Sequence, residues 1–193
     1  MAGLVLAAGS GRRYGSPKAL ADTGEGPWVL RALAALVGLP HRLVVIGAAA
    51  PDVRAVLPDD VEPVENPAHA KGLGSSLRAG LRAAGAHPDV VAVVVLPVDL
   101  PDVGRPVVDR VLRTVLDPVG GTVPELPDVL ARATFAGRPG HPVVLGRHHW
   151  TGAAAAAVGD TGAHDYLRRH GVLGIECGDL AGGADVDRPP GIR

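Results

Sequence analysis

A glycine-rich loop near the start of the chain, within LVLAAGSGRRYGSPKAL, has residues suited to holding phosphate. Gly9, Gly11 and Gly15 lack side chains, so the backbone N–H groups around them can approach phosphate oxygens closely. Arg13 and Lys18 add positive charge to the same loop. The spacing fits neither the phosphate loop G-x-x-x-x-G-K-S/T nor the dinucleotide loop G-x-G-x-x-G. Taken alone, the loop is equally compatible with a surface turn that carries solvated arginines.

Carboxylates in two later loops could hold a metal ion. Asp99 follows the most apolar run of the chain and lies between Pro97 and Pro101, which stiffen its loop. A carboxylate fixed there can ligate Mg²⁺, which favours oxygen ligands, although a single aspartate in a turn more often accepts backbone N–H groups. Asp185 and Asp187 lie in GADVDRP, and alone they are typical of a solvated tail.

The second lysine of the chain also lies in a glycine-rich loop. Of nineteen lysines and arginines, only Lys18 and Lys71 are lysine. Lys71 and Gly74 precede a predicted helix, for which Ser75 or Ser76 is the expected N-cap. A helix N-terminus with small residues favours anions, but ordinary capping accounts for the serines without the lysine.

Short apolar runs and helical periodicity predict the elements that position these loops. The runs at 3–7, 42–47, 61–65 and 90–96 are expected to be strands, and three of them are continuous, as in strands buried on both faces. Helical spacing follows at 27–39, 51–57, 75–86 and 105–116, with Pro27 and Pro51 as the first helical residues of their segments. This alternation indicates an α/β fold with a parallel sheet, in which ligands bind beyond the carboxyl ends of the strands.

The second half of the chain is less regular. Segments 129–137 and 141–146 are expected to be strands joined through GRPG as a hairpin. Segments 153–158 and 163–171 are expected to be helical, the latter ended by Gly171, and 172–177 to be a last strand. Gly140 and His141 begin one of these strands, where the histidine could contact a substrate, although a lone histidine is more often structural.

Composition narrows the class of protein. The length of 193 residues, 47% of them hydrophobic, suits one domain. The net charge of −1 gives no reason to expect nucleic acid or membrane partners. A single cysteine, Cys177, excludes an internal disulfide and fits a reducing, cytoplasmic location. The opening apolar segment is short and precedes its arginines, unlike a secretion signal.

None of these motifs is specific by itself, but their order along nearly the whole chain resembles the MobA-like NTP transferase family. LAAGSGRRYGSPKAL is similar to the signature L-A-A/G-G-x-x-x-R-M-G-x-x-K, and GLGSSLRAGL to G-x-x-x-S-I/L-x-x-G-I/L. PVDLP, GRPGHPVVL, VGDTGAHDYL and DVDRP stand where the family has D-Q/M-P, a G-H-P strand, G-D-x-G-A/R-R and D-I/V-D-T-P. The molybdenum cofactor cytidylyltransferase branch is the most similar. Departures from the pattern are Tyr14, His69, Leu100, His164 and Arg188.

The resemblance implies a single-domain, three-layer Rossmann-like fold over residues 1–193, with a mostly parallel sheet. The N-terminal half is expected to bind an NTP and the C-terminal half an acceptor. The implied activity is Mg²⁺-dependent transfer of a nucleoside monophosphate from the NTP to a phosphorylated acceptor, such as molybdopterin, with release of pyrophosphate.

The resemblance also implies a role for each matching residue. Arg13, Lys18 and Asp99 are expected to be catalytic, and Asp99 and Asp187 to hold Mg²⁺. Gly140 and His141 are expected to contact the acceptor. The residues expected to bind the nucleotide are Leu6, Ala7, Ala8, Gly9, Gly11, Gly15, Lys71, Gly74 and Ser75.

Several alternatives stay open at this point. Ala8, where guanylyltransferases of the family tend to have glycine, favours CTP over GTP as the donor. His69, Leu100 and His164 lie in the half expected to face the pterin, so phospholactate or a sugar phosphate is an alternative acceptor. A catalytically silent NTP-binding protein is a further alternative, whereas a dinucleotide oxidoreductase lacks the required glycine spacing and an acidic residue after the second strand. The residues do not indicate an oligomeric state.

Overall fold

One seven-stranded sheet organises the chain, whose computed structural model describes residues 1–117 and 125–189. The strand order is β3-β2-β1-β4-β6-β5-β7. Strands β1, β2, β3 and β4 are parallel, β6 is antiparallel to β4 and β5, and β7 is parallel to β5. The mostly parallel α/β sheet is therefore confirmed. The strands are β1 (Ala2–Leu6), β2 (His41–Ile46), β3 (Glu62–Glu65), β4 (Ala92–Pro97), β5 (Leu130–Phe135), β6 (Arg138–Gly146) and β7 (Leu173–Glu176).

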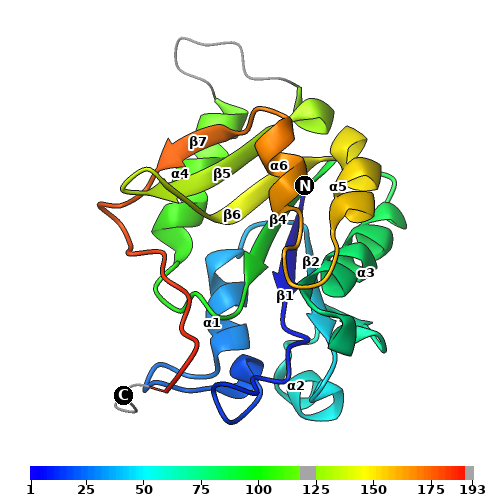
Figure 1. Cartoon of the computed structure of the whole chain (residues 1–193), viewed down its shortest axis with the longest axis vertical. Helices are drawn as coiled ribbons and strands as arrows, with labels where there is room; N and C mark the ends of the chain where they lie inside the picture. Colours follow the sequence, from blue (N-terminus) through cyan, green and yellow to red (C-terminus); the bar gives the residue numbers. More distant parts are fainter. Residues whose placement is uncertain (118–124, 190–193) are drawn as a thin grey trace.

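Helices cover both faces of the sheet and complete the three layers (Figure 1). They are α1 (Trp28–Ala35), α2 (Ala50–Val56), α3 (Leu73–Gly85), α4 (Arg105–Leu116), α5 (Trp150–Ala156) and α6 (His164–Arg169). Short 3₁₀ turns lie at Lys18–Leu20, His69–Lys71, Leu126–Asp128 and Arg147–His149. No helix among the described residues is long and apolar enough to cross a membrane.

Two hydrophobic cores lie on opposite faces of the sheet. Side chains alternate along a strand, so Val5 packs with α1, α2 and α4, whereas Leu4 packs with α3, α5 and α6. Every residue of β1 and of β4 is buried, as their continuous apolar runs predict. These two strands are neighbours at the centre of the sheet, and loops that leave their carboxyl ends are held by both cores.

The starts of three helices differ from the expected ones. Pro27 precedes α1 as its N-cap, and α2 begins at Ala50, one residue before Pro51. Helix α3 begins at Leu73 with Gly72 as its N-cap, so the prediction of Ser75 or Ser76 as the cap is wrong. The reason is that both serines are buried in the first turn, where their hydroxyls accept hydrogen bonds from Nδ2 of Asn66 at 2.9 and 3.1 Å.

The hairpin between β5 and β6 is tighter than expected. The predicted GRPG connection is wrong, because Arg138 to Gly140 already belong to β6. The connection is the pair Ala136–Gly137, with φ of 51° and 74°. Two positive φ values are typical of a type I′ turn, which matches the twist of the paired strands.

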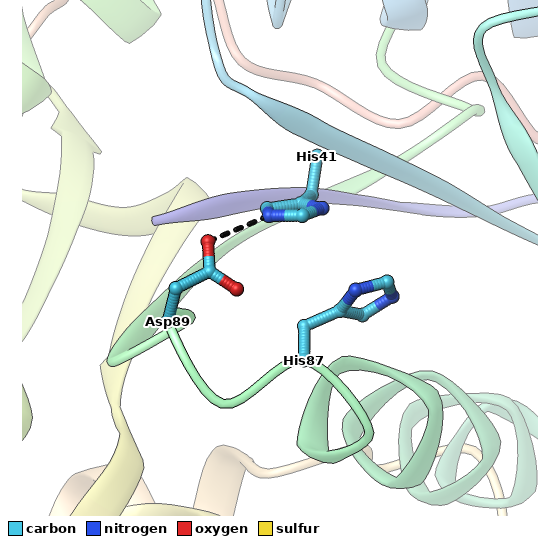
Figure 2. Close-up of side chains that lie close together, drawn as sticks. All are labelled: His41, His87 and Asp89. Atoms are coloured by element: carbon cyan, nitrogen blue, oxygen red, sulfur yellow. Dashed lines mark hydrogen bonds and ion pairs between the residues drawn. The ribbon is translucent and has the colours of Figure 1, made fainter.

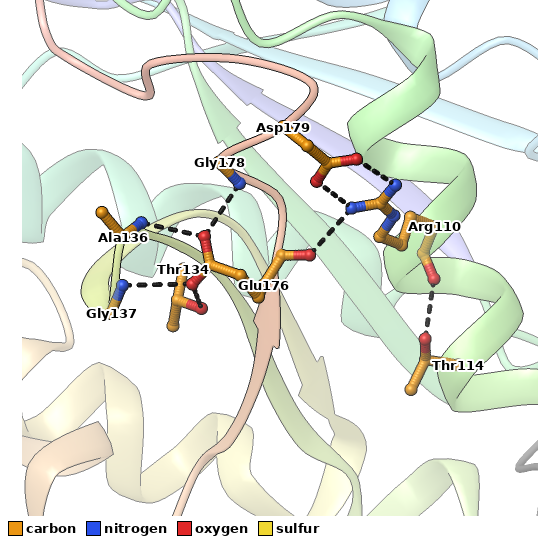
Figure 3. Close-up of polar contacts among 8 residues, drawn as sticks. All are labelled: Arg110, Thr114, Thr134, Ala136, Gly137, Glu176, Gly178 and Asp179. Atoms are coloured by element: carbon orange, nitrogen blue, oxygen red, sulfur yellow. Dashed lines mark hydrogen bonds and ion pairs between the residues drawn. The ribbon is translucent and has the colours of Figure 1, made fainter.

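Polar contacts fix the end of β7 against this hairpin and against α4 (Figure 3). The Glu176 carboxylate accepts hydrogen bonds from the backbone N–H groups of Gly137, Ala136 and Gly178 and from the Thr134 hydroxyl, and together they lower its pKa to about 2. Nη2 of Arg110 on α4 donates to Oδ2 of Asp179 at 2.8 Å. The chain beyond β7 therefore leaves from a fixed point and runs down beside the sheet to the loop after β1 (Figure 1).

Candidate functional site

A cluster of two cations and two carboxylates lies beyond the carboxyl ends of the central strands. Nζ of Lys18 donates hydrogen bonds to Oδ2 of Asp99 at 3.1 Å and to Oδ1 of Asp187 at 2.9 Å. Nη1 of Arg13 donates to the other oxygen of Asp187, also at 2.9 Å. The Lys18 side chain is only 14% exposed, whereas that of Arg13 is 75% exposed. Lys18 is thus the central residue of the cluster.

Three separate segments bring this cluster together. Leu6 at the end of β1 is in register with Pro97 at the end of β4, so the loops that follow leave the same edge of the sheet. The backbone N–H of Val98 donates to the carbonyl of Leu6 at 3.2 Å. The backbone N–H of Val186 donates to the carbonyl of Asp99 at 2.9 Å, which places Asp187 beside Asp99. Asp187 is therefore part of this cluster rather than of a solvated tail.

The charges of the cluster support one another. Partial burial disfavours the charged ammonium of Lys18, but the hydrogen bond from Lys18 to Asp187 and the negative charge of Asp99 outweigh burial and raise the Lys18 pKa. The hydrogen bond from Lys18, more than that from Arg13, lowers the pKa of Asp187. At neutral pH the Lys18 ammonium is therefore charged and lies between the two carboxylates. A metal ion, free or bound to phosphate, could occupy the same position.

The glycine-rich loop is built around a turn at Gly11. The carbonyl of Gly11 accepts hydrogen bonds from the N–H groups of Tyr14 at 2.9 Å and Gly15 at 2.8 Å, and the φ of Gly11 is +61°. A Cβ at Gly11 would lie 1.8 Å from the carbonyl oxygen of Ser16, so only glycine fits. The N–H groups of residues 9–13 have no partner among the described residues, and they are the donors that remain for a ligand.

Tyr14, which replaces the methionine of the family signature, anchors this loop. Its ring packs edge-on against Trp28, with centroids 5.1 Å apart and an angle of 60° between the planes. Trp28 begins α1 and is almost fully buried. An edge-to-face aromatic pair of this kind contributes roughly 0.5–1.5 kcal/mol, and here it holds the loop to the core.

A cleft of about 940 Å³ opens over the cluster and the loop. Predicted residues from both halves of the chain line it: Leu6, Ala8, Gly9, Gly11, Arg13, Lys18, Asp99, Gly140, His141 and Asp187. Its lining is a mixture of polar and apolar surface, and the space is large enough for a drug-sized ligand. The acceptor residues predicted on β6 therefore share one cavity with three of the nucleotide residues predicted after β1, Ala8, Gly9 and Gly11.

Five predicted nucleotide-binding residues do not line this cleft. Ala7 directly follows β1, where its N–H donates to the carbonyl of Val45, and the N–H of Gly15 donates to the carbonyl of Gly11. Ala7 and Gly15 therefore contribute to the shape of the loop rather than to its surface.

The other three, Lys71, Gly74 and Ser75, belong to the start of α3. Lys71 is exposed outside the cleft. The N–H of Gly74 donates to the carbonyl of Gly159 at 2.8 Å, and a Cβ there would lie 2.5 Å from the carbonyl of Ala157, so this glycine serves helix packing. The hydroxyl of Ser75 donates to the carbonyls of Ala68 and Gly72.

Six polar residues that were not predicted as site residues line the cleft: Ser10, Arg12, His69, Ser76, Asp160 and Asp185. The family motifs quoted for their segments carry a signal for Asp160 and Asp185, whereas Ser76 is indistinguishable in sequence from its buried neighbour. Asp160 accepts the N–H of Leu73 at 3.4 Å. Burial, with a smaller contribution from Arg132, lowers the pKa of His141 to about 4, so this imidazole is neutral at physiological pH.

Comparison with known proteins agrees with this geometry. Residues 3–173 match the MobA-like NTP transferase domain. The chain belongs to this family. Membership supports nucleotidyl transfer as the class of activity, and it confirms the resemblance drawn from the order of the motifs.

Solved structures support the family fold. The Mycobacterium tuberculosis protein Rv0371c is 29% identical, with a TM-score of 0.73 over 97% of this chain and 92% of that protein. A structure of the same protein in complex with manganese has a TM-score of 0.64 over 91% and 87% of the two chains. The Rubrobacter xylanophilus bifunctional protein GlmU is 41% identical over 97 residues, which are 47% of this chain but only 20% of that relative.

Proposed function

We propose that the chain transfers a nucleoside monophosphate, CMP in preference to GMP, from an NTP to a phosphorylated small molecule, with molybdopterin as the first candidate acceptor. The observation that carries this proposal is the Lys18 ammonium held between Asp99 and Asp187 at the glycine-rich loop. Family membership supports the nucleotidyl transfer itself. The choice of base and of acceptor is argued from the residues that line the cleft.

The loop after β1 would hold the triphosphate through the N–H groups of residues 9–13. Lys18 and Arg13 would offset the negative charge that develops on the α-phosphate and the leaving pyrophosphate. Transfers of this kind depend mainly on positioning and charge stabilisation. The acceptor phosphate is already ionised at neutral pH and attacks the α-phosphorus directly, so no general base is needed. The neutral His141 is suited to a hydrogen bond with the acceptor.

The cluster fits a divalent cation. Asp99 and Asp187 face one shared cation, the Lys18 ammonium, and their oxygens are the donors that Mg²⁺ and Mn²⁺ prefer. We propose Mg²⁺ as the physiological ion, held by Asp99 and Asp187. When bound, it would supply positive charge that offsets the negative charge of the phosphates. Lys18 would then turn one of its hydrogen bonds from a carboxylate to a phosphate.

The end of the cleft beside Ala8 is the proposed site of the base. A Cβ at Gly47 would come within 2.9 Å of the Ala8 Cβ and 2.7 Å of the His69 Cβ, so these two cleft residues lie near each other against β2. The methyl of Ala8 fills space that glycine would leave, which favours a pyrimidine over the larger guanine. His69 and the buried Leu100 give this cleft a different surface from the family pattern, so the acceptor must be tested directly.

The test is pyrophosphate release by the full chain, with four NTPs against a panel of acceptors that includes molybdopterin, its cofactor form, phospholactate and sugar phosphates. Lys18→Ala is expected to lower the rate by about 10²–10³, and Asp99→Ala to abolish metal-dependent turnover while the melting temperature remains near that of the wild type. Lys71→Ala, the only other lysine, is the matched control and is expected to keep full activity.

Each outcome distinguishes the alternatives. A preference for GTP would overturn the CMP proposal, and activity with a different acceptor would replace molybdopterin. NTP binding without pyrophosphate release for any acceptor would indicate a silent binding protein. Wild-type turnover in Asp99→Ala would remove the proposed chemistry altogether.

A further inference from the structure

A second cluster of potential metal ligands, shown in Figure 2, lies outside the set of residues that line the cleft. It consists of His41, His87 and Asp89, which offer one ligand atom each, all within 4.8 Å of one another. Nε2 of His41 lies 2.7 Å from Oδ2 of Asp89, and the two imidazole centroids are 4.5 Å apart. It is the only such group of three or more ligands found among the described residues.

The topology places this cluster at the opposite edge of the sheet. His41 begins β2 and is in register with Ala2, the first residue of β1, whereas the cleft lies beyond Leu6 at the other end of that strand. His87 and Asp89 belong to the connection between α3 and β4. A ligand bound here would join β2 to this connection and would not contact the nucleotide.

The connection that carries two of the ligands is held rigidly. The Arg147 guanidinium donates hydrogen bonds to the carbonyls of Gly85, His87 and Val90, at 3.0, 3.1 and 2.7 Å. A metal site binds best when its side chains are held in place before the ion arrives. The backbone around His87 and Asp89 therefore needs no reordering.

A second carboxylate, that of Glu62, orients one of the imidazoles. Oε2 of Glu62, at the start of β3, lies 2.9 Å from Nε2 of His87. Metal-binding histidines commonly donate one ring N–H to a carboxylate and bind the ion through the other nitrogen. The Glu62 contact gives His87 this arrangement.

We propose that His41, His87 and Asp89 bind a divalent transition-metal ion of the zinc class in a structural site. Two imidazoles and a carboxylate suit Zn²⁺, Co²⁺ or Ni²⁺ rather than Mg²⁺. Bonds of about 2.0–2.2 Å place the ligands of one ion within about 4.4 Å of each other, so small side-chain rotations complete the site. Asp89 is 63% exposed and the imidazoles 28% each, which leaves an entry path and room for water as a further ligand.

Two ion pairs without a metal are the competing explanation. His41 would pair with Asp89 and His87 with Glu62, each as a protonated imidazole. Two charged imidazoles at this separation repel each other, whereas a bound metal ion requires both to be neutral. Metal binding therefore distinguishes the two explanations directly.

The test is titration of the full chain, stripped of metal and free of any histidine tag, with Zn²⁺ by calorimetry and with Co²⁺ by visible absorption. One equivalent is expected to bind, and His41→Gln and His87→Gln are each expected to weaken it by about 10²-fold or more, Glu62→Gln by about 10-fold. At free Zn²⁺ near 100 times Kd, the melting temperature of the wild type is expected to rise by about 5–10 °C.

Two variants serve as controls. His148→Gln removes an exposed imidazole that pairs with Asp128 but has no second histidine in its group, and it should bind Zn²⁺ like the wild type. Asp99→Asn, which alters the cleft, should retain this equivalent as well. The proposal fails if the wild type binds no Zn²⁺ that survives Asp99→Asn, or if His41→Gln and His87→Gln bind as tightly as the wild type with unchanged apo melting temperatures.

Discussion

Replacing Gly11 by alanine should show how much the shape of the glycine-rich loop contributes to NTP binding, because the charged residues of the loop are unchanged. The residue has a φ of +61°, and its added Cβ would lie 1.8 Å from the Ser16 carbonyl oxygen, against about 3.5 Å for an ordinary contact. The left-handed conformation alone costs an alanine about 1–2 kcal/mol. Because the clash is with backbone, no rotamer relieves it, and the loop must change its conformation.

The expected loss of affinity follows from these costs. An energy of 1–2 kcal/mol lowers the population of the native loop by about 5–30-fold, and the apparent NTP affinity falls by at least the same factor. Gly24→Ala is the control, because Gly24 also has a positive φ, +102°, but an added Cβ meets nothing within 4 Å, and the residue does not line the cleft. It should lower stability without changing NTP affinity.

Gly9→Ala provides the complementary measurement. An added Cβ at Gly9 meets no protein atom within 4 Å, and Gly9 lines the cleft. This variant should melt like the wild type but bind NTP more weakly, because the methyl occupies space near the proposed phosphates. Calorimetric titration with CTP and Mg²⁺, together with thermal melts, measures both quantities. Gly11→Ala protein that binds NTP within about twofold of the wild type would refute the proposed role of the loop.

Three further predictions follow from particular side chains. Asp187→Asn should lower turnover by at least about 10²-fold. Asp185→Asn should change turnover less than tenfold, because Asp185 is exposed and has no side-chain partner among the described residues. Equal effects of the two variants on pyrophosphate release would contradict the assignment of Asp187 to the site. The Glu176 pKa is lowered from 4.5 to about 2, so its stabilising contribution is present above about pH 4.5 and disappears as the pH falls toward 2. Glu176→Gln should therefore be less stable than the wild type at neutral pH and lose less stability between pH 4.5 and 2 in acid unfolding. The control Glu65→Gln, whose only side-chain contact among the described residues is with Arg54, should unfold like the wild type. Ala136→Asn should raise the melting temperature by about 2–4 °C, because asparagine tolerates the positive φ of 51° better than alanine; an unchanged or lower value would argue against strain at that turn.

The sequence was informative where burial dictated residue type. The runs in β1 and β4 are apolar because both faces are covered, and this pattern predicts strands without any knowledge of their neighbours. The position of Lys18 and Asp99 then followed from the rule that such loops share an edge of the sheet. These inferences depend on local sequence and on general topology.

Predictions that required knowledge of distant partners were less successful. Ser75 has the residue type of a helix cap, but Asn66 and the carbonyls of two earlier residues hold it inside the first turn. Lys71 has the charge and the glycine neighbours of a phosphate ligand, but it is exposed and does not line the cleft as its neighbours Ala70 and Gly72 do. Asp187 was recognised through the order of the family motifs, since nothing in its own segment reveals that it meets Lys18.

The return of the chain after β7 has a consequence for biosynthesis. Lys18 and Asp187 are 169 residues apart in sequence, and the hydrogen bond from Val186 to the Asp99 carbonyl links the last part of the cluster to the centre of the sheet. While a ribosome is still making residues 177–189, the nascent protein has its loop and its central strands but lacks one of the two carboxylates. During synthesis, the formation of secondary structure should therefore precede the appearance of activity.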